Sequence, residues 1–163
     1  MIDCAVINAG PLVALSLIDQ LDLLPALFAQ CWVPQTVFDE VAVAGIGKPG
    51  SKSLQSADWR ARVRMSPSPD PLLVMELDAG EADVISLARH LSPCVAIIDE
   101  RRGRRIAQQV YGLSVKGTAG ILVEAQRRGL ISGVRARLLE LRAAGYFIAD
   151  NVIVAACNAA GEQ

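Results

Sequence analysis

The chain has 163 residues, of which 52% are hydrophobic and 20% are charged, and its formal net charge at pH 7 is −1. This length fits one well-buried domain and is too short for two ordinary ones, so we treat residues 1–163 as a single domain. The near-neutral charge argues against a protein that coats nucleic acid through a general basic excess. No run approaches the roughly 18 apolar residues of a membrane helix, and Asp3 stands where a secretory signal carries positive charge. We therefore expect a cytoplasmic protein without a membrane partner.

Short apolar runs alternate with helical patterns in the first part of the chain. Residues 3–8, "DCAVIN", end in a polar residue and the turn-like "AGP", which predicts a buried strand. The apolar spacing of residues 12–28 predicts two helices, the second beginning at Pro25. "CWVP", 31–34, predicts another strand, and "QTVFDEVAVA", 35–44, predicts a helix. One side of that helix carries three apolar residues, Val37, Val41 and Ala44.

The middle of the chain is rich in Gly, Ser and Lys. This composition predicts a mobile loop at residues 45–56, and we take 45–58 as flexible. Its glycines spell GxGxxG, but they follow a helix where a dinucleotide-binding motif must follow a strand, which argues against a nucleotide site. "WRARVRMS", 59–66, alternates apolar residues with arginine and predicts an edge strand, and "SPSPDP" predicts a linker.

A well-defined helix and a buried strand follow the linker. "LDAGEADVISLARHL", 77–91, predicts a helix because Asp78 and Glu81 have the spacing of a capping box. "CVAIID", 94–99, is apolar up to its last residue and predicts a buried strand.

Helices dominate the last part of the chain. "RRIAQQVYG", 104–112, predicts a helix that Gly112 ends, and "LSVKGT", 113–118, predicts a short strand. Two further helices are expected at 119–130 and 134–145, each with a glycine placed to end it. The alternation of buried strands and helices predicts a three-layer α/β/α sandwich with a central parallel sheet.

The cysteines and the single histidine argue against a zinc site. They are scattered and include no CxxC pair, whereas tetrahedral zinc sites use clustered ligands. We expect three of the four cysteines to be small, buried strand residues in a reducing compartment, and the histidine to be a solvent-facing helix residue. The residues concerned are Cys4, Cys31, Cys94, Cys157 and His90.

Four polar side chains are predicted to lie at the same edge of the sheet. Asn8 and Asp99 each end a strand, Glu40 lies in the second turn of the helix after "CWVP", and Glu81 lies in the first turn of its helix. Because the carboxyl ends of parallel strands meet at one edge, where ligands bind, we expect these side chains to form one acidic hollow. Taken singly, each has a plainer interpretation as a helix cap, a turn residue or a surface charge.

Carboxylates brought together repel each other unless a cation lies between them. Oxygen ligands at an accessible edge suit Mg²⁺ or Mn²⁺, and these ions support phosphodiester hydrolysis. We expect Glu40, Glu81 and Asp99 to be the ligands. Asp83 is less well placed, because two residues along a helix from Glu81 means a nearly opposite face.

Four arginines, Arg101, Arg102, Arg104 and Arg105, follow Asp99 in "IIDERRGRR". At a helix N-terminus they oppose the helix dipole, which costs some tenths of a kcal/mol each. A role in attracting the phosphates of a nucleic acid accounts for their position. The alternative is that they pair with Asp99, Glu100 and other surface acids.

Several of these segments resemble one known family. "VINAGPLVAL", "WVPQTVFDEV", "LDAGEADVISLA" and "IIDERRGRRIAQQVYGLSVKGTAGIL" are similar to PIN-like domains, in particular to a branch described as predicted nucleic-acid-binding proteins. The resemblance covers the chain except residues 45–68. It implies an α/β/α sandwich and an Mg²⁺- or Mn²⁺-dependent ribonuclease, a class that includes the toxins of toxin–antitoxin pairs.

The resemblance also implies roles for single residues. Glu40, Glu81 and Asp99 match the acidic positions of the family, Asp83 is an additional candidate, and Thr118 matches a hydroxyl beside the site. Asn8 stands where active PIN nucleases have their first acid. An amide can still orient a water, but it lacks a negative charge and weakens divalent binding.

Two hypotheses follow. The first is a metal-dependent endoribonuclease in which Asn8, Glu40, Glu81 and Asp99 are catalytic, with RNA, a small antitoxin and a second copy of the chain as partners. The second is a degenerate PIN domain that binds nucleic acid or a protein without cutting, which Asn8 favours.

Overall fold

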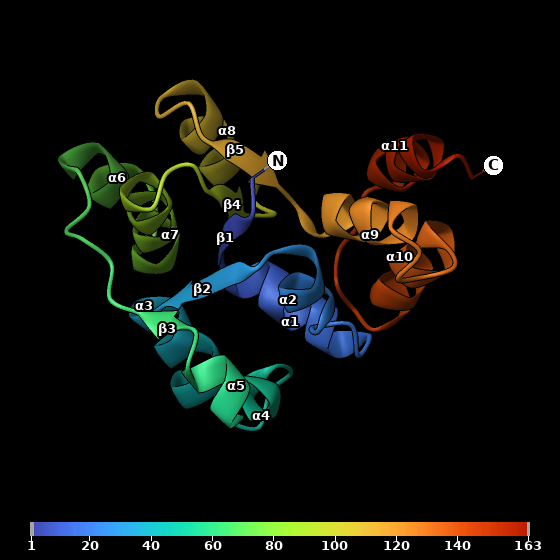
Figure 1. The fold of residues 1–163 in the computed structure, drawn as a ribbon, viewed down its shortest axis with the longest axis horizontal. Coiled ribbons are helices and arrows are strands. Elements are labelled where there is room, and N and C mark those ends of the chain that lie inside the picture. Colours follow the sequence, from blue (N-terminus) through green and yellow to red (C-terminus); the bar gives the residue numbers. More distant parts are fainter. Residues whose placement is uncertain (1, 163) are drawn as a thin grey trace.

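A five-stranded, all-parallel sheet forms the centre of the molecule, as the computed structural model of residues 2–162 shows (Figure 1). The strands are β1 (Cys4–Ile7), β2 (Gln30–Pro34), β3 (Val63–Arg64), β4 (Val95–Ile97) and β5 (Ser114–Lys116). Their order in the sheet is β3-β2-β1-β4-β5. β1 is therefore central, and all four of its residues are buried, as the continuous apolar run "CAVI" requires.

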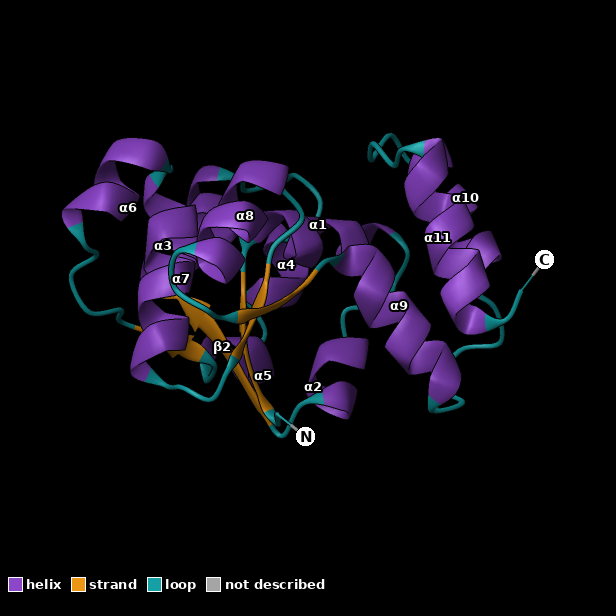
Figure 2. Cartoon of the chain, turned by 90° about the horizontal axis from the view of Figure 1, so that it is seen from above, coloured by secondary structure: helices purple, strands orange, loops and turns teal. Residues whose placement is uncertain are grey.

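Helices cover both faces of this sheet (Figure 2), which confirms the predicted α/β/α sandwich. The longer helices are α1 (Ala9–Leu17), α7 (Ala79–His90), α8 (Arg101–Gln109), α9 (Thr118–Arg127), α10 (Val134–Ala143) and α11 (Asp150–Ala160). The shorter ones are α2 (Leu23–Leu27), α3 (Gln35–Phe38), α4 (Ser51–Leu54), α5 (Ala57–Arg60) and α6 (Pro71–Glu76), together with the π-helix η1 (Asp39–Ala44). α7 packs across β1, β2 and β4, while α9 contacts α1, α2 and β5.

The register of β1 and β4 fixes where the predicted site lies. Ile7 pairs with Ile97 in the parallel ladder, so the two strands end side by side. The backbone N–H of Asn8 then donates to the carbonyl of Ile97 at 3.0 Å. Asn8 and the residues after Ile97 consequently leave the sheet at the same edge.

The helix predicted at 35–44 changes its winding at Asp39, where α3 passes into η1. A π-helix bonds residue i to i+5, so its wider turn shifts the buried face relative to an α-helix. The predicted apolar side of Val37, Val41 and Ala44 therefore does not hold at its last residue: Val37 and Val41 are buried, but Ala44 is exposed and Ala42 is buried in its place. The predicted helix start at Pro25 is also wrong, since α2 begins two residues earlier.

Two short helices, α4 and α5, occupy much of the segment predicted as a loop. Leu54 and Trp59 anchor them in the core. Trp59 was expected in an edge strand, but the Ser56 side chain accepts a hydrogen bond from the Trp59 N–H and caps α5 there. β3 does lie at the sheet edge, yet it comprises only Val63 and Arg64. The flexibility of 45–58 stays a prediction.

The helix α11 lies beyond the last element that the sequence predicted. It packs against α9 and α10, as Figure 2 shows at the C-terminal side of the molecule. Its buried residues, Ile153, Ala156 and Cys157, have helical spacing, which was the available signal.

All four cysteines are free and buried, one more than predicted, and His90 is exposed, as predicted. Cys4 is the first residue of β1 and Cys94 directly precedes the neighbouring strand β4, and their Sγ atoms lie 2.7 Å apart. Among residues 2–162, no helix is long and apolar enough to cross a membrane.

Candidate active site

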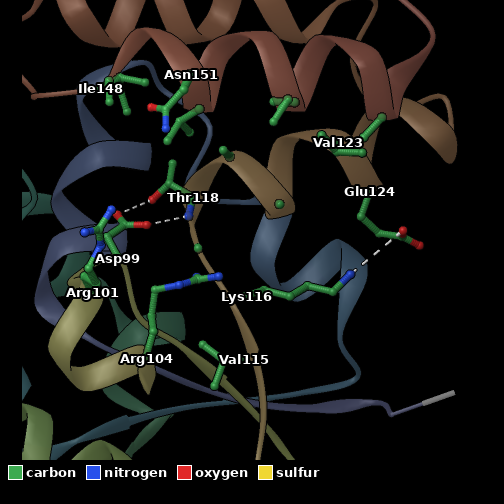
Figure 3. A pocket seen from close by; sticks show the side chains of 18 of the residues that line it. Asp99, Arg101, Arg104, Val115, Lys116, Thr118, Val123, Glu124, Ile148 and Asn151 are labelled. Atoms are coloured by element: carbon green, nitrogen blue, oxygen red, sulfur yellow. Dashed lines mark hydrogen bonds and ion pairs between the residues drawn. The ribbon is translucent and has the colours of Figure 1, made fainter. Parts of the chain in front are cut away.

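Asp99 is held by three hydrogen bonds at the carboxyl end of β4. The backbone N–H of Thr118 donates to Asp99 Oδ1 at 2.6 Å, and the Thr118 hydroxyl donates to Oδ2 at 2.7 Å (Figure 3). The hydroxyl of Tyr146 also donates to Oδ2. β5 runs beside β4 and ends at Lys116, so α9 begins beside Asp99 with Thr118 in its first turn. These donors fix the orientation of the carboxylate.

Glu81 is a buried carboxyl group with an unsatisfied oxygen. It lies in the first turn of α7, where the Asp78 side chain accepts a hydrogen bond from the Glu81 N–H at 2.8 Å and confirms the predicted cap. The residue is only 5% exposed, and its Oε2 has no hydrogen-bond partner among the described residues. A buried acceptor without a donor is costly, which indicates a ligand at this position.

Neighbouring acids raise the pKa values of Glu81 and Glu40. Burial, together with the neighbouring carboxyl groups of Asp78 and Glu100, raises the pKa of Glu81 to about 8. Burial also raises the pKa of Glu40, again with Asp78 and Glu100 adding to the effect. We call Glu40, Asp78, Glu81 and Glu100 the acidic rim. Their mutual repulsion favours a bound cation.

Two glycines leave space beside the carboxylates of Glu81 and Asp99. A Cβ atom on Gly103, in the first turn of α8, would lie 2.8 Å from Glu81 Oε2. A Cβ atom on Gly117 would lie 2.8 Å from Asp99 Oδ1. Both distances are shorter than any ordinary contact, so a larger residue at either position would displace a carboxylate. The space beside Glu81 thus exists because residue 103 has no side chain.

The chemistry of these residues fits a divalent cation held by few protein ligands. Within residues 2–162, no three acidic, cysteine or histidine side chains converge closely enough to enclose a metal together. Mg²⁺ often takes only one or two carboxylates and keeps several waters. The unsatisfied Glu81 oxygen suits such an open site, because the other members of the acidic rim add negative charge there. Asp99 is a second, oriented carboxylate, and it directly precedes Glu100 of the rim in the chain.

Asn8 and Asp83 occupy different surroundings. Asn8 is buried between the ends of β1 and β4 and precedes the first turn of α1. Asp83 is half-buried and accepts a hydrogen bond from the Thr36 hydroxyl at 2.8 Å, which ties α7 to α3. The structure thus gives Asp83 a partner outside the acidic rim.

The four arginines diverge along α8. Arg101 and Arg104 line a cavity that also contains Asp99, and Arg104 Nη1 donates to the Ile98 carbonyl at 3.0 Å. Arg102 forms an ion pair with Glu76 of α6, and Arg105 is exposed. Arg101 and Arg104 are therefore the two that flank the site.

That cavity has a volume of about 750 Å³ and lies between the first turn of α8, the end of β5 and one face of α11 (Figure 3). Asp99 and Thr118 form its inner wall, and Tyr146 and Phe147 line it from the segment between α10 and α11. The cavity thus opens directly beside the carboxylate that ends β4.

The sequence analysis missed three contributors to this site. Glu100 was considered only as a partner of the arginines and Asp78 only as a cap, although both raise the pKa of Glu81. Tyr146 lies in an irregular segment 47 residues from Asp99, and no local pattern indicates their contact. For Glu100, the adjacent Asp99 was an available signal.

Comparison with known proteins gives one match. Residues 4–162 match the sequence model of a family described as a PIN domain. No curated protein and no solved structure is similar enough to the chain to count as a match.

Proposed function

Because the chain belongs to the PIN domain family over residues 4–162, we propose that it is a metal-dependent endoribonuclease that hydrolyses phosphodiester bonds in RNA. The observation that carries the proposal is the unsatisfied, buried Glu81 oxygen in the acidic rim, whose member Glu100 directly follows Asp99 at the carboxyl edge of a parallel sheet. Ligands bind at this edge in open α/β sheets.

Glu81 and Asp99 are the proposed holders of an Mg²⁺ or Mn²⁺ ion, with Glu40 contributing negative charge. When bound, the ion would activate a water and offset the charge of the scissile phosphate. Thr118 and Tyr146 keep Asp99 oriented through their hydrogen bonds. Arg101 attracts the substrate backbone from the rim of the adjoining cavity.

Cleavage of a labelled single-stranded RNA in the presence of Mn²⁺ or Mg²⁺ tests this proposal. We expect wild-type protein to cut the RNA and EDTA to stop it. Asp99→Asn and Glu81→Gln should each lower the rate by at least about 100-fold, because oriented ligand sets lose most of their effect when one member is removed. Asp83→Asn is the matched control, and its rate should stay within about threefold of wild type, since Asp83 bonds Thr36 instead. Equal inactivity of wild type and variants with both ions across several RNAs would refute the enzymatic proposal.

A degenerate PIN domain is the second candidate, and Asn8 favours it. The residue supplies an amide at the end of β1, so the site has one negative charge fewer than an aspartate would give. Calorimetric titration with Mn²⁺ separates the two candidates: a nuclease should give a saturable heat that Glu81→Gln reduces, whereas a degenerate site should give none while RNA binding persists. Asn8→Asp should strengthen Mn²⁺ binding in either case.

Two partner proposals accompany the nuclease. A toxin should arrest the growth of a bacterial host on expression, and Asp99→Asn should abolish the arrest if RNA cleavage causes it. A homodimer should give twice the chain mass in light scattering. Such a dimer cannot use the apolar residues Leu12, Ala14 and Leu15 of α1 as its face, because they are buried within this chain's own core.

A further inference from the structure

We propose that the 750 Å³ cavity beside Asp99 is a nucleobase-binding site, in which an unpaired base of the RNA stacks on Phe147 next to the phosphate that is cut. The inference rests on the proposed function, because it takes RNA as the ligand. It adds a specificity-determining residue, Phe147, outside the carboxylates that hold the metal.

Phe147 is the first reason for this assignment. It is 86% exposed, the largest exposed fraction among the large hydrophobic residues described, and it lines the cavity. Exposing a whole aromatic ring forgoes the stabilisation that burial gives. The chain has only seven aromatic residues, two Trp, two Tyr and three Phe, so one held in solvent beside the site indicates a binding role. Bases stack on exposed aromatic rings in single-strand recognition.

The chemistry of the cavity walls is the second reason. α11 contributes small apolar side chains to the lining, Val152, Ala155 and Ala159, which leave room for a flat ring. The polar Asn151 of α11 lies on the same side as the Asp99–Thr118 pair in that view and offers an amide to a base edge. An apolar wall with a few polar groups is typical of a small-ring pocket.

Cations at the rim are the third reason. The cavity is lined by three cationic side chains, Arg101, Lys116 and Arg127. Of the carboxylates that line it, Glu124 pairs with two of them: Glu124 Oε2 lies 3.9 Å from Lys116 Nζ and 3.8 Å from Arg127 Nη1. Positive side chains around an aromatic and apolar pocket match a strand of phosphates with a splayed base. This charge favours RNA over an apolar helix of a protein partner.

The position of Phe147 relative to Tyr146 is the fourth reason. Tyr146 donates to Asp99 Oδ2, and Phe147 follows it directly in the chain, so the backbone that carries the exposed ring is tied to this carboxylate and both residues line the same cavity. A base on Phe147 would thus fix the register of the strand over Asp99.

A double-mutant cycle between protein and RNA tests the proposal. The probes are fluorescein-labelled 10-nucleotide RNAs, one intact and ten others with a single abasic ribose at each position in turn. Binding is measured by anisotropy in EDTA with wild type, Phe147→Ala, Phe147→Trp and Met75→Ala. Met75 is the matched control, because it is 81% exposed on α6 and does not line the cavity.

We expect Phe147→Ala to weaken binding of the intact RNA by about 5- to 100-fold. For an RNA whose missing base is the one that stacks, the same substitution should have almost no effect. Phe147→Trp should retain binding, and Met75→Ala should match wild type.

Equal weakening of all eleven RNAs by Phe147→Ala would overturn the base site, because it would indicate a general loss of contact or structure. Unchanged affinity for RNA would also overturn it and would favour a polypeptide as the occupant. Absence of RNA binding by wild type would overturn it too. Base-dependent binding without any Mn²⁺-dependent cleavage would support the base site and refute the nuclease, so the two failures are distinguishable.

Discussion

Glu81 illustrates at the residue scale how a site can be costly for folding. Its carboxyl is buried, its Oε2 lacks a donor, and two other acids lie close enough to raise its pKa. Natural proteins accept such strain mainly where a ligand relieves it. The cost should therefore be measurable in the absence of metal.

The stability of the metal-free protein should depend on pH through Glu81. Its folded pKa of about 8 lies above the ordinary carboxyl value of 4.5, so the folded state binds the proton more tightly than the unfolded state. The stabilisation is complete below the unfolded pKa and is lost as pH rises through the folded pKa. In EDTA, we expect Glu81→Gln to melt higher than wild type at pH 8.5, with a difference that shrinks towards pH 5. Thermal denaturation at both pH values measures this, and a difference independent of pH would contradict it.

Gly103 permits a second prediction at the same scale. A Cβ atom there would lie 2.8 Å from Glu81 Oε2 and 3.2 Å from the Ile98 side chain. Gly103→Ala should therefore displace the carboxyl and weaken Mn²⁺ binding at least about tenfold, as second-sphere changes do. Gly120→Ala is the matched control within a helix, because its nearest neighbours lie 3.7 Å away or farther. The control should bind Mn²⁺ normally and gain stability from helix propensity. Normal binding by Gly103→Ala would show that Glu81 can move freely.

Local rules predicted the elements more reliably than the contacts between them. Apolar runs defined β1 and β4, and the capping spacing of Asp78 and Glu81 placed the start of α7 correctly. The π-helical winding after Phe38 could not be predicted, because the same apolar residues also fit an α-helix. The resemblance to PIN domains indicated Thr118 beside the site, whereas the Tyr146–Asp99 contact depends on how α10 and α11 pack, which no local pattern encodes.

The C-terminal helices contain an element-scale feature that can be tested. The two carboxylate oxygens of Glu162 accept hydrogen bonds from the backbone N–H groups of Val134 and Arg135, at the N-terminus of α10. These donors lower the pKa of Glu162. Because the anion satisfies free donors and complements the helix dipole, it ties the chain end to α10.

Replacing Glu162 should destabilise α10 in a pH-dependent way. We expect Glu162→Gln to lower the free energy of unfolding by about 1 kcal/mol at pH 7, the usual size of a helix-cap effect. A lowered folded pKa gives a stabilisation that is present above the unfolded pKa and lost as pH falls through the folded one. The difference should therefore vanish in acid, below about pH 3 to 4. Urea denaturation measures it, with the exposed Glu140→Gln on the same helix as the control. A Glu162 effect no larger than that of Glu140 would contradict the cap.

At the scale of the whole molecule, the strand order explains why distant residues meet. β1 lies between β2 and β4, and β5 lies beside β4, so their carboxyl ends form one edge. Three of these strands are followed by Asn8, Asp99 and Thr118. Glu40 of η1 and Glu81 of α7 both lie near Asp78 and Glu100. The sequence could indicate that the strands are parallel, but the order of pairing is a property of the folded chain.

The same edge carries two chemically different neighbourhoods. The acidic rim lies towards α7 and η1, and the apolar cavity with its cationic side chains lies towards α11. The two are joined by neighbouring residues of the chain, because Asp99 lines the cavity and Glu100 belongs to the rim. A substrate with a charged backbone and flat apolar rings matches both. The proposed nuclease and the proposed base site both depend on these two neighbourhoods lying at one edge of the sheet.

The most direct test of the central claim is a crystal structure of the protein grown in Mn²⁺, with data collected at the manganese absorption edge. The account predicts an anomalous peak at the carboxyl edge of the sheet, bonded to an oxygen of Glu81 or Asp99 at about 2.0 to 2.3 Å, and its loss in Glu81→Gln crystals. An edge without a peak at saturating Mn²⁺, or a peak bound only elsewhere on the molecule, would contradict it.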